Sequence, residues 1–168
     1  MPGGIVPLRR TAPAQTDTQS RQTVRVPTLS AAGEALLASD RLAHLVTIEP
    51  DGTPQVSCVW VELDDAGDIV FSSLDRRRKL DNIRRDPRVS LSIEQGELNE
   101  YGLAQYMVVH GRATITEGGG PALLQHLAHT YLGPDEVFPK MDDPPEGFIV
   151  HIAIERVGGI GEWTAPTP

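Results

Sequence analysis

Residues 70–88 read VFSSLDRRRKLDNIRRDPR, and this stretch decides the fold. A strand is expected at its start, over Ile69–Ser73, directly after a turn-forming run of Asp and Gly. The apolar period then changes, because Leu80 and Ile83 stand three residues apart, as on one face of a helix. We therefore predict a helix over Arg76–Arg85.

Both ends of this helix carry recognisable signals. Ser73 or Asp75 can cap its start, because short polar side chains accept hydrogen bonds from the first free N–H groups of a helix. Pro87 ends it, since proline disfavours helical geometry in the residue before it. Arg88–Glu94 alternates apolar and polar residues and predicts the next strand.

The helix is strongly basic in an acidic chain. Between Arg76 and Arg88 there are seven Lys or Arg against two Asp, whereas the 168 residues together carry a net charge of −8. A helix N-terminus attracts anions through its free N–H groups and dipole. Arg and Lys add charge-assisted hydrogen bonds to phosphate. The segment thus predicts either a phosphate site or a solvated basic helix paired with surface carboxylates.

The remaining chain predicts a mainly β protein. Six strands joined by short turns, with two or three short helices, favour a six-stranded antiparallel β-barrel with helical insertions. Besides the segments above, we expect helices over Ala31–Ala38 and from Gly118 to Leu132, and strands over Leu42–Glu49, Pro54–Leu63, Gln105–Glu117 (with Gly111 a possible bulge) and Phe148–Val157.

Composition restricts the possible functions. An acidic chain with few aromatic residues is a poor candidate for nucleic-acid binding. A single cysteine, Cys58, rules out an intramolecular disulfide and a Cys-rich zinc site, and His126 and His129 lack further ligands, so no metal is expected. Without an apolar run of membrane-spanning length or a secretory signal, we expect a soluble cytoplasmic protein.

Two parts of the chain differ in character. Residues 1–26 are rich in Pro, Gln, Thr and Arg without a sustained apolar period, and we expect a flexible extension or an arm packed on a partner subunit. The regular pattern begins at Pro27, so we expect one folded domain over residues 27–168.

Three motifs together resemble a known family. They are Asp51-Gly52-Thr53-Pro54-Gln55-Val56-Ser57, then Arg77-x-Lys79-x-x-Asn82-Ile83-Arg84-Arg85-Asp86-Pro87-Arg88, then Val109-His110-Gly111-Arg112-Ala113. Their order and spacing, from about Pro27 to Val157, resemble the pyridoxamine 5'-phosphate oxidase-like split-barrel family. More narrowly, they resemble its actinobacterial branch that uses the deazaflavin coenzyme F420.

The resemblance implies a homodimer that binds its flavin in a groove between subunits. It assigns the cofactor's phosphate to Arg77 and Lys79, with Ser72, Ser73 and Asn82 hydrogen-bonding nearby. The ring would lie along the strand that presents Gln55, Ser57 and Val59. Tyr106, and in the same manner Trp163, would reach in from the second subunit. Three consecutive arginines, Arg76 to Arg78, leave open which one faces the phosphate.

The implied function is an F420-dependent oxidoreductase that transfers hydride from the reduced deazaflavin to a small conjugated organic acceptor. Hydride transfer is the cofactor's chemistry, so no catalytic side chain is assigned. The tail of F420 is a lactyl-oligoglutamate, and Arg84, Arg85 and Arg88 favour it over the shorter FMN. The alternatives are an FMN-dependent oxidase or reductase on the same fold, and a carrier that binds F420 or flavin without turnover.

Overall fold

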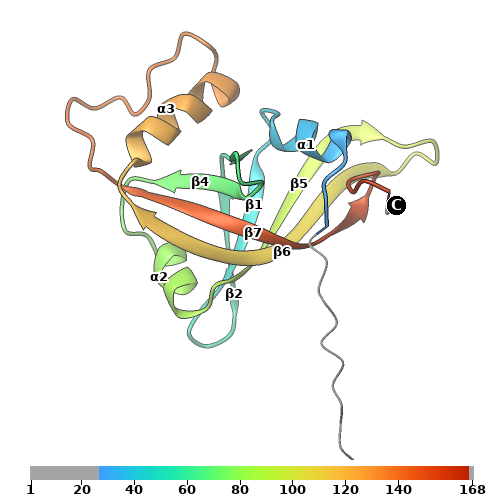
Figure 1. The fold of residues 1–168 in the computed structure, drawn as a ribbon, viewed down its shortest axis with the longest axis horizontal. Helices are drawn as coiled ribbons and strands as arrows, with labels where there is room; N and C mark the ends of the chain where they lie inside the picture. Colours follow the sequence, from blue (N-terminus) through green and yellow to red (C-terminus); the bar gives the residue numbers. More distant parts are fainter. Residues whose placement is uncertain (1–26, 167–168) are drawn as a thin grey trace, which may run out of the picture.

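The computed structural model describes residues 27–166, which form one antiparallel sheet with three helices (Figure 1). This confirms the expected mainly β fold. The elements, in chain order, are α1 (Ala31–Leu37), β1 (Ala43–Ile48), β2 (Pro54–Val59), β3 (Glu62–Leu63), β4 (Ile69–Ser73), α2 (Arg78–Arg85), β5 (Arg88–Leu98), β6 (Ala104–Glu117), α3 (Gly120–Tyr131) and β7 (Phe148–Ile160).

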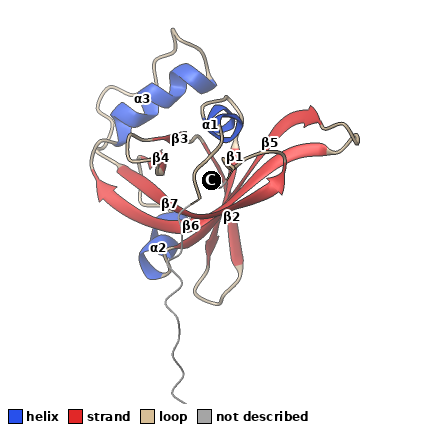
Figure 2. Ribbon diagram, turned by 45° about the vertical axis from the view of Figure 1, so that its right-hand side comes forward, coloured by secondary structure: helices blue, strands red, loops and turns tan. Residues whose placement is uncertain are grey.

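The sheet curls into a barrel because its two edges are tied together. The strand order is β2-β1-β5-β6-β7-β4-β3, so β2 and β3 are the edge strands. Only Trp60 and Val61 separate them in the chain. Three residue steps from Val59 to Glu62 span at most about 11 Å, so the edges must lie close together. Figures 1 and 2 show the long strands β6 and β7 wrapping around the resulting interior.

The described residues form seven strands, where the sequence predicted six. The difference lies in Pro54–Leu63, which was expected as one strand. Its first part, β2, pairs with β1, and its last two residues, β3, pair with β4. The chain stays extended while it changes partner, so the alternation of side chains continues across the break. An alternating pattern reports an extended backbone and says nothing of which strand it pairs with.

Helix α2 is fixed to the barrel by a buried polar contact. Leu80 and Ile83 are buried, as their spacing predicted. Between them Asn82, only 3% exposed, donates from Nδ2 to Oγ1 of the fully buried Thr47 on β1 at 3.0 Å. In both views α2 lies on the opposite side of β6 and β7 from α1 and α3 (Figures 1 and 2).

The start of α2 differs from the prediction. The helix begins at Arg78, two residues later than expected, and Arg77 occupies the N-cap position without a side-chain cap. Ser73 does not cap the helix; its hydroxyl donates instead to the carbonyl of Asp75 at 2.9 Å, in the bend before α2. Strand β4 and the end of α2 match the predicted boundaries.

The two ends of the described chain are joined. Trp163, 5% exposed, belongs to the barrel core, and its carbonyl accepts from the N–H of Ser30, the residue that caps α1. Residues 1–26, where an extension was predicted, lie outside the described part. Among the helices of residues 27–166, none combines the length and apolar character that crossing a membrane requires.

The predicted bulge at Gly111 is confirmed, because the pairing of β6 with β7 shifts register between His110 and Gly111. A Cβ at Gly111 would overlap the carbonyl oxygen of Ala153 and lie 2.9 Å from Cγ2 of Ile152. The two strands can therefore approach this closely only without a side chain.

We predict that Gly111→Ala lowers the free energy of unfolding by about 1–3 kcal/mol, because β7 must move to accept the methyl group. Gly158→Ala is the matched control, since a Cβ there meets nothing within 4 Å. Urea denaturation measures both variants. Equal stability of the two would contradict the close approach at Gly111.

Candidate anion-binding groove

A groove of about 650 Å³ opens where the end of β2 meets the connection from β4 to α2. Its lining residues include two groups that differ in chemistry. The group from β4, α2 and the connection between them, called here the basic wall, contains Ser72, Ser73, Asp75, Arg77 and Lys79. The second group, called the aromatic wall, contains Trp60, Leu124, Phe138 and Met141. Cys58 and Val59, the last two residues of β2, also line the groove.

Lys79 is the cation best placed to bind an anion. It is half-buried, with Nζ 6.0 Å from the centroid of the Phe71 ring. Burial, and then the charge of Arg77, hold its pKa below the usual value of 10.5. None of the ion pairs found within residues 27–166 involves Lys79. A half-buried ammonium without a carboxylate partner is a strong site for an external anion.

The structure sorts the three consecutive arginines. Arg76 pairs with Asp81 through Nε at 2.6 Å. Arg78 reaches Glu49, the residue after β1, at 3.4 Å. Arg77 alone of the three lines the groove, where its nearest carboxylate is that of Asp75 at 3.5 Å. Arg77 is therefore the arginine positioned to face an anion there.

The two serines support the basic wall through the backbone. Ser72 donates from Oγ to the carbonyl of Gly120 at 3.0 Å, and Ser73 donates to the carbonyl of Asp75. A hydroxyl has one proton, so neither donates to a bound anion while these bonds hold. The start of α2 remains available, because its N-cap residue makes no side-chain cap and the first helical N–H groups are free.

Gln55, Ser57 and Asn82 do not line the groove; they form a hydrogen-bonded chain that ties α2 to β1 and β2. Asn82 donates to Thr47, and Thr47 Oγ1 donates to Gln55 Oε1 at 2.9 Å. Gln55 Nε2 donates in turn to Ser57 Oγ at 2.7 Å. Of the strand residues assigned to a ring by resemblance, only Val59 reaches the groove.

Tyr106 and Trp163 lie away from the groove in the single chain. Tyr106, on β6, is half-buried, and its carbonyl accepts from Trp163 Nε1 at 2.8 Å. The Trp163 ring is packed into the core of its own chain, so the expectation that it reaches into a second subunit is wrong. The position of Tyr106 in a dimer stays a prediction.

Sequence reasoning missed the aromatic wall. Trp60, within the stretch expected as one strand, is half-buried and lines the groove, stacked on Tyr131 with centroids 5.3 Å apart. Phe138 and Met141 come from the segment between α3 and β7, which the sequence presented as a plain loop. Large apolar residues inside a polar, proline-rich loop were the signal that could have identified them.

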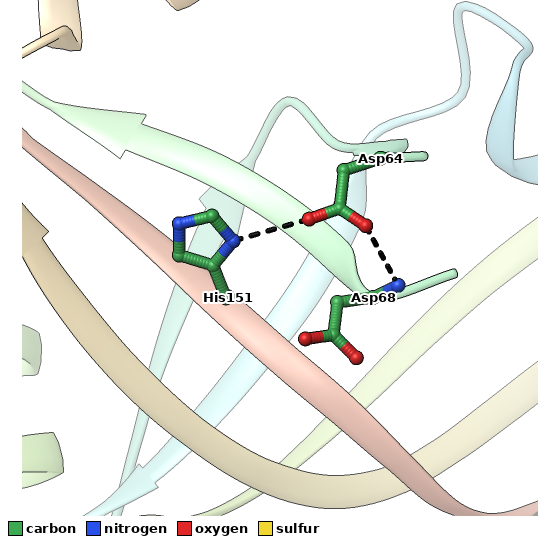
Figure 3. A group of neighbouring side chains, drawn as sticks. All are labelled: Asp64, Asp68 and His151. Carbon is green, nitrogen blue, oxygen red and sulfur yellow. Dashed lines mark hydrogen bonds and ion pairs between the residues drawn. The ribbon is translucent and has the colours of Figure 1, made fainter. Parts of the chain in front are cut away.

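A separate cluster joins the turn between β3 and β4 to strand β7. Figure 3 shows Asp64, Asp68 and His151 facing one another, with Asp64 Oδ2 3.2 Å from His151 Nδ1. Burial alone would raise the pKa of Asp64, but hydrogen bonds from the backbone of Asp68 and Ala66 and from His151 lower it. These contacts are those of a tight turn anchored to β7, and we assign the cluster no chemistry.

Comparison with known proteins agrees with this architecture. The family model described as pyridoxamine 5'-phosphate oxidase matches residues 29–161. Among solved structures, an F420 reductase is 27% identical with a TM-score of 0.62, covering 77% of this chain and 98% of its own. A conserved hypothetical protein from Mycobacterium tuberculosis is 26% identical with a TM-score of 0.61, covering 82% of this chain and 86% of its own.

More distant structures share the fold alone. HupZ from Group A Streptococcus is 17% identical with a TM-score of 0.56, and the match covers 82% of this chain and 98% of that one. The family match spans the whole barrel, from Leu29, two residues before α1, to Gly161, the residue after β7. The chain thus belongs to the pyridoxamine 5'-phosphate oxidase family, whose split-barrel fold its motifs indicated.

Proposed function

We propose that this protein is an oxidoreductase that binds coenzyme F420 in the groove and passes hydride to a small conjugated organic acceptor. The observation that carries the proposal is Lys79, a half-buried cation with no ion pair among the described residues, beside Arg77 and the uncapped start of α2. All three favour a phosphate on the basic wall.

The chain's own part in the reaction is to bind and orient. Lys79 and Arg77 would hold the phosphate, and Cys58 and Val59 would line the part of the groove that receives the ring. When bound, reduced F420 would supply a hydride, which is two electrons and one proton, and the acceptor would take its second proton from solvent. The apolar side chains of the aromatic wall exclude water from this space.

The preference for F420 over FMN rests on a different basis from the one the sequence offered. The arginines expected to hold the oligoglutamate tail do not line the groove, and each has a contact elsewhere. Arg84 lies 3.6 Å from Asp81, Arg85 donates to the carbonyl of Ile48, and Arg88 pairs with Asp86 at 2.6 Å. What supports F420 is the likeness to an F420 reductase. FMN is the second candidate, because two cations suffice for one phosphate.

We also propose the homodimer that the family resemblance implies. On the outer face of the sheet, the register aligns Val56, Val46, Ser90 and His110 across β2, β1, β5 and β6. This row carries no carboxylate, and Val56 is 58% exposed. Cys58 lies on the same face of β2 and also lines the groove, so a second copy docked there borders the cofactor site.

Lys79→Ala is expected to weaken F420 binding by about 1–3 kcal/mol, or roughly 5- to 150-fold, through loss of a charge-assisted hydrogen bond. Arg78→Ala is the matched control, because the neighbouring Arg78 points to Glu49 and away from the groove. Tryptophan quenching in parallel titrations with F420 and FMN measures both.

Three results of these titrations would contradict the proposal. Equal losses in the Lys79 and Arg78 variants would mean that the phosphate sits elsewhere. Tighter binding of FMN than of F420 by the unaltered protein would refute the cofactor. Binding of neither would refute the function as a whole.

F420 affinity should also fall as the pH rises through the lowered pKa of Lys79, at a pH where an ordinary lysine is still charged. Burial favours the neutral amine, and only the ammonium attracts the phosphate, so affinity is full below that pKa and is lost above it. Lys79→Arg should remove this dependence, because guanidinium stays charged. A pH-independent affinity in the unaltered protein would exclude Lys79 as the ligand.

Val56→Glu should convert the dimer to a monomer, because it buries a carboxylate in an interface whose aligned row carries none. Val137→Glu is the control, since Val137 is 66% exposed on the loop between α3 and β7. Sedimentation velocity distinguishes the two states. A dimer that persists in the Val56 variant would place the interface on another face.

A further inference from the structure

We propose that a second pocket, separate from the groove, binds a small carboxylate with a short apolar tail. The pocket has a volume of about 370 Å³ and lies where α1, the second half of β5 and the segment after β7 meet (Figures 1 and 2). It shares no lining residue with the groove, so the inference goes beyond the proposed function and uses no part of it. Its main lining residues are Ala32, Ala35, Leu36, Arg41, Gln95 and Trp163.

The apolar part of the pocket is held in place around Trp163. The indole Nε1 donates to the carbonyl of Tyr106 at 2.8 Å, and the Trp163 carbonyl accepts from the N–H of Ser30. The ring also lies directly against Gly161, where a Cβ would overlap the indole. Trp163 and Leu36 are each only 5% exposed. A preformed apolar surface of this kind receives a hydrocarbon tail without the entropic cost of ordering the protein.

Arg41 supplies the positive charge of the pocket, and Gly96 determines where its guanidinium lies. A Cβ at Gly96 would stand 2.7 Å from Nη2, 2.8 Å from Cζ and 2.9 Å from Nη1 of Arg41. The guanidinium therefore lies over the glycine backbone, in space that any side chain would take. Gly96 also has a φ of +90°, in the left-handed region that favours glycine.

The charge of Arg41 has no partner within residues 27–166. None of the ion pairs found there involves Arg41. Its hydrogen bonds to described residues use the backbone, because its N–H donates to Ser39 Oγ and its carbonyl accepts from the Tyr131 hydroxyl. The chain has 23 Asp and Glu against 15 Lys and Arg, so carboxylates are not scarce. A placed guanidinium left without one suits a carboxylate from outside, which it binds in a bidentate manner.

The other polar side chains of the pocket also favour an acceptor. Gln95 Oε1 accepts from Gln105 Nε2 at 3.3 Å, which leaves the amide N–H groups of Gln95 without a partner among the described residues. The Ser39 hydroxyl already donates to the carbonyl of Leu36 and accepts from Arg41. The lining side chains thus offer donors from Gln95 and Arg41 and include no carboxylate. A carboxylate satisfies such donors, whereas an ammonium, itself only a donor, does not.

The space for the tail comes from two alanines of α1. Ala32 and Ala35 both line the pocket and are three residues apart, on one face of the helix. A larger side chain at either position would fill the space beside the Trp163 ring. The site therefore combines an apolar hollow with donors from Arg41 and Gln95, as a short aliphatic carboxylate requires.

The test uses the full-length protein and pentanoate. The chain has two tryptophans, Trp60 and Trp163, so Trp60→Phe assigns the two indole N–H signals in an NMR spectrum. Pentanoate added to the unaltered protein near neutral pH should shift the Trp163 signal saturably, with a Kd of about 1 mM, as suits so small a ligand. Pentylammonium, of similar shape and opposite charge, should not. Sodium chloride at matched ionic strength gives the baseline, and no titration contains F420.

Two pairs of variants test the charge and the space. Arg41→Gln should raise the pentanoate Kd at least about tenfold, through loss of a charge-assisted hydrogen bond. Arg112→Gln, at an exposed arginine of β6 outside the pocket, should change it less than about twofold. Ala35→Leu fills the hollow and should also raise the Kd at least about tenfold. Ala31→Leu, on the same helix but outside the lining, should not.

A third pair tests the placement of the guanidinium. Gly96→Ala displaces it and should raise the Kd about three- to tenfold. Gly102→Ala is the matched control, because its φ of +76° imposes similar backbone strain in the same hairpin while a Cβ there meets nothing within 4 Å. If the Gly96 variant does not fold, Arg41→Gln still decides the question, because Arg41 is exposed.

Three results would overturn the proposal. The first is a Trp163 signal that pentanoate leaves in place, or moves no further than chloride does. The second is equal affinity for pentylammonium, since the pocket would then bind the tail alone. The third is an equal pentanoate Kd in the Arg41 and Arg112 variants, which would place the carboxylate elsewhere.

Discussion

The two-residue link Trp60-Val61 is the constraint on which the rest of the structure depends. It joins β2 and β3, the opposite edges of the sheet, and so forces the sheet to close. Closure brings the end of β2 to the connection from β4 to α2, which is where the groove opens. Tyr131 reinforces the link through both backbone groups of Val61, so α3 is drawn to the same place. Closing the barrel therefore also brings together the residues that line the groove.

The position of α2 decides which of its many charges can serve a ligand. The buried bond from Asn82 to Thr47 fixes the helix against β1, with Leu80 and Ile83 inward. In that orientation Asp81 of α2 pairs with Arg76, just before the helix, and Arg78 at the helix start reaches the half-buried Glu49. The same orientation leaves Lys79 on the groove. A basic helix thus yields a specific site because packing separates one cation from the rest.

Local patterns predicted local structure, and failed where the answer depended on residues distant in sequence. Strand β4 and the end of α2 follow from the local pattern, whereas Arg77 and Lys79, which line the groove, were assigned through the family resemblance. The break at Trp60 was invisible, because alternation persists while the pairing partner changes. Asn82 was assigned to the cofactor by resemblance, and nothing local reveals Thr47, thirty-five positions away, as its hydrogen-bond partner. Phe138 depends on Gln125 of α3, and a loop sequence gives no sign of that.

Lys79 is the reason we propose that the groove is a binding site and not a by-product of barrel closure. Burying a cation without a counter-ion destabilises the folded chain, and burial is the first cause of its lowered pKa. A chain selected for stability alone would place a leucine there, as it does at Leu80, or supply a carboxylate, as it does for Arg78. A bound anion would offset this cost, and on that ground we propose Lys79 as a ligand.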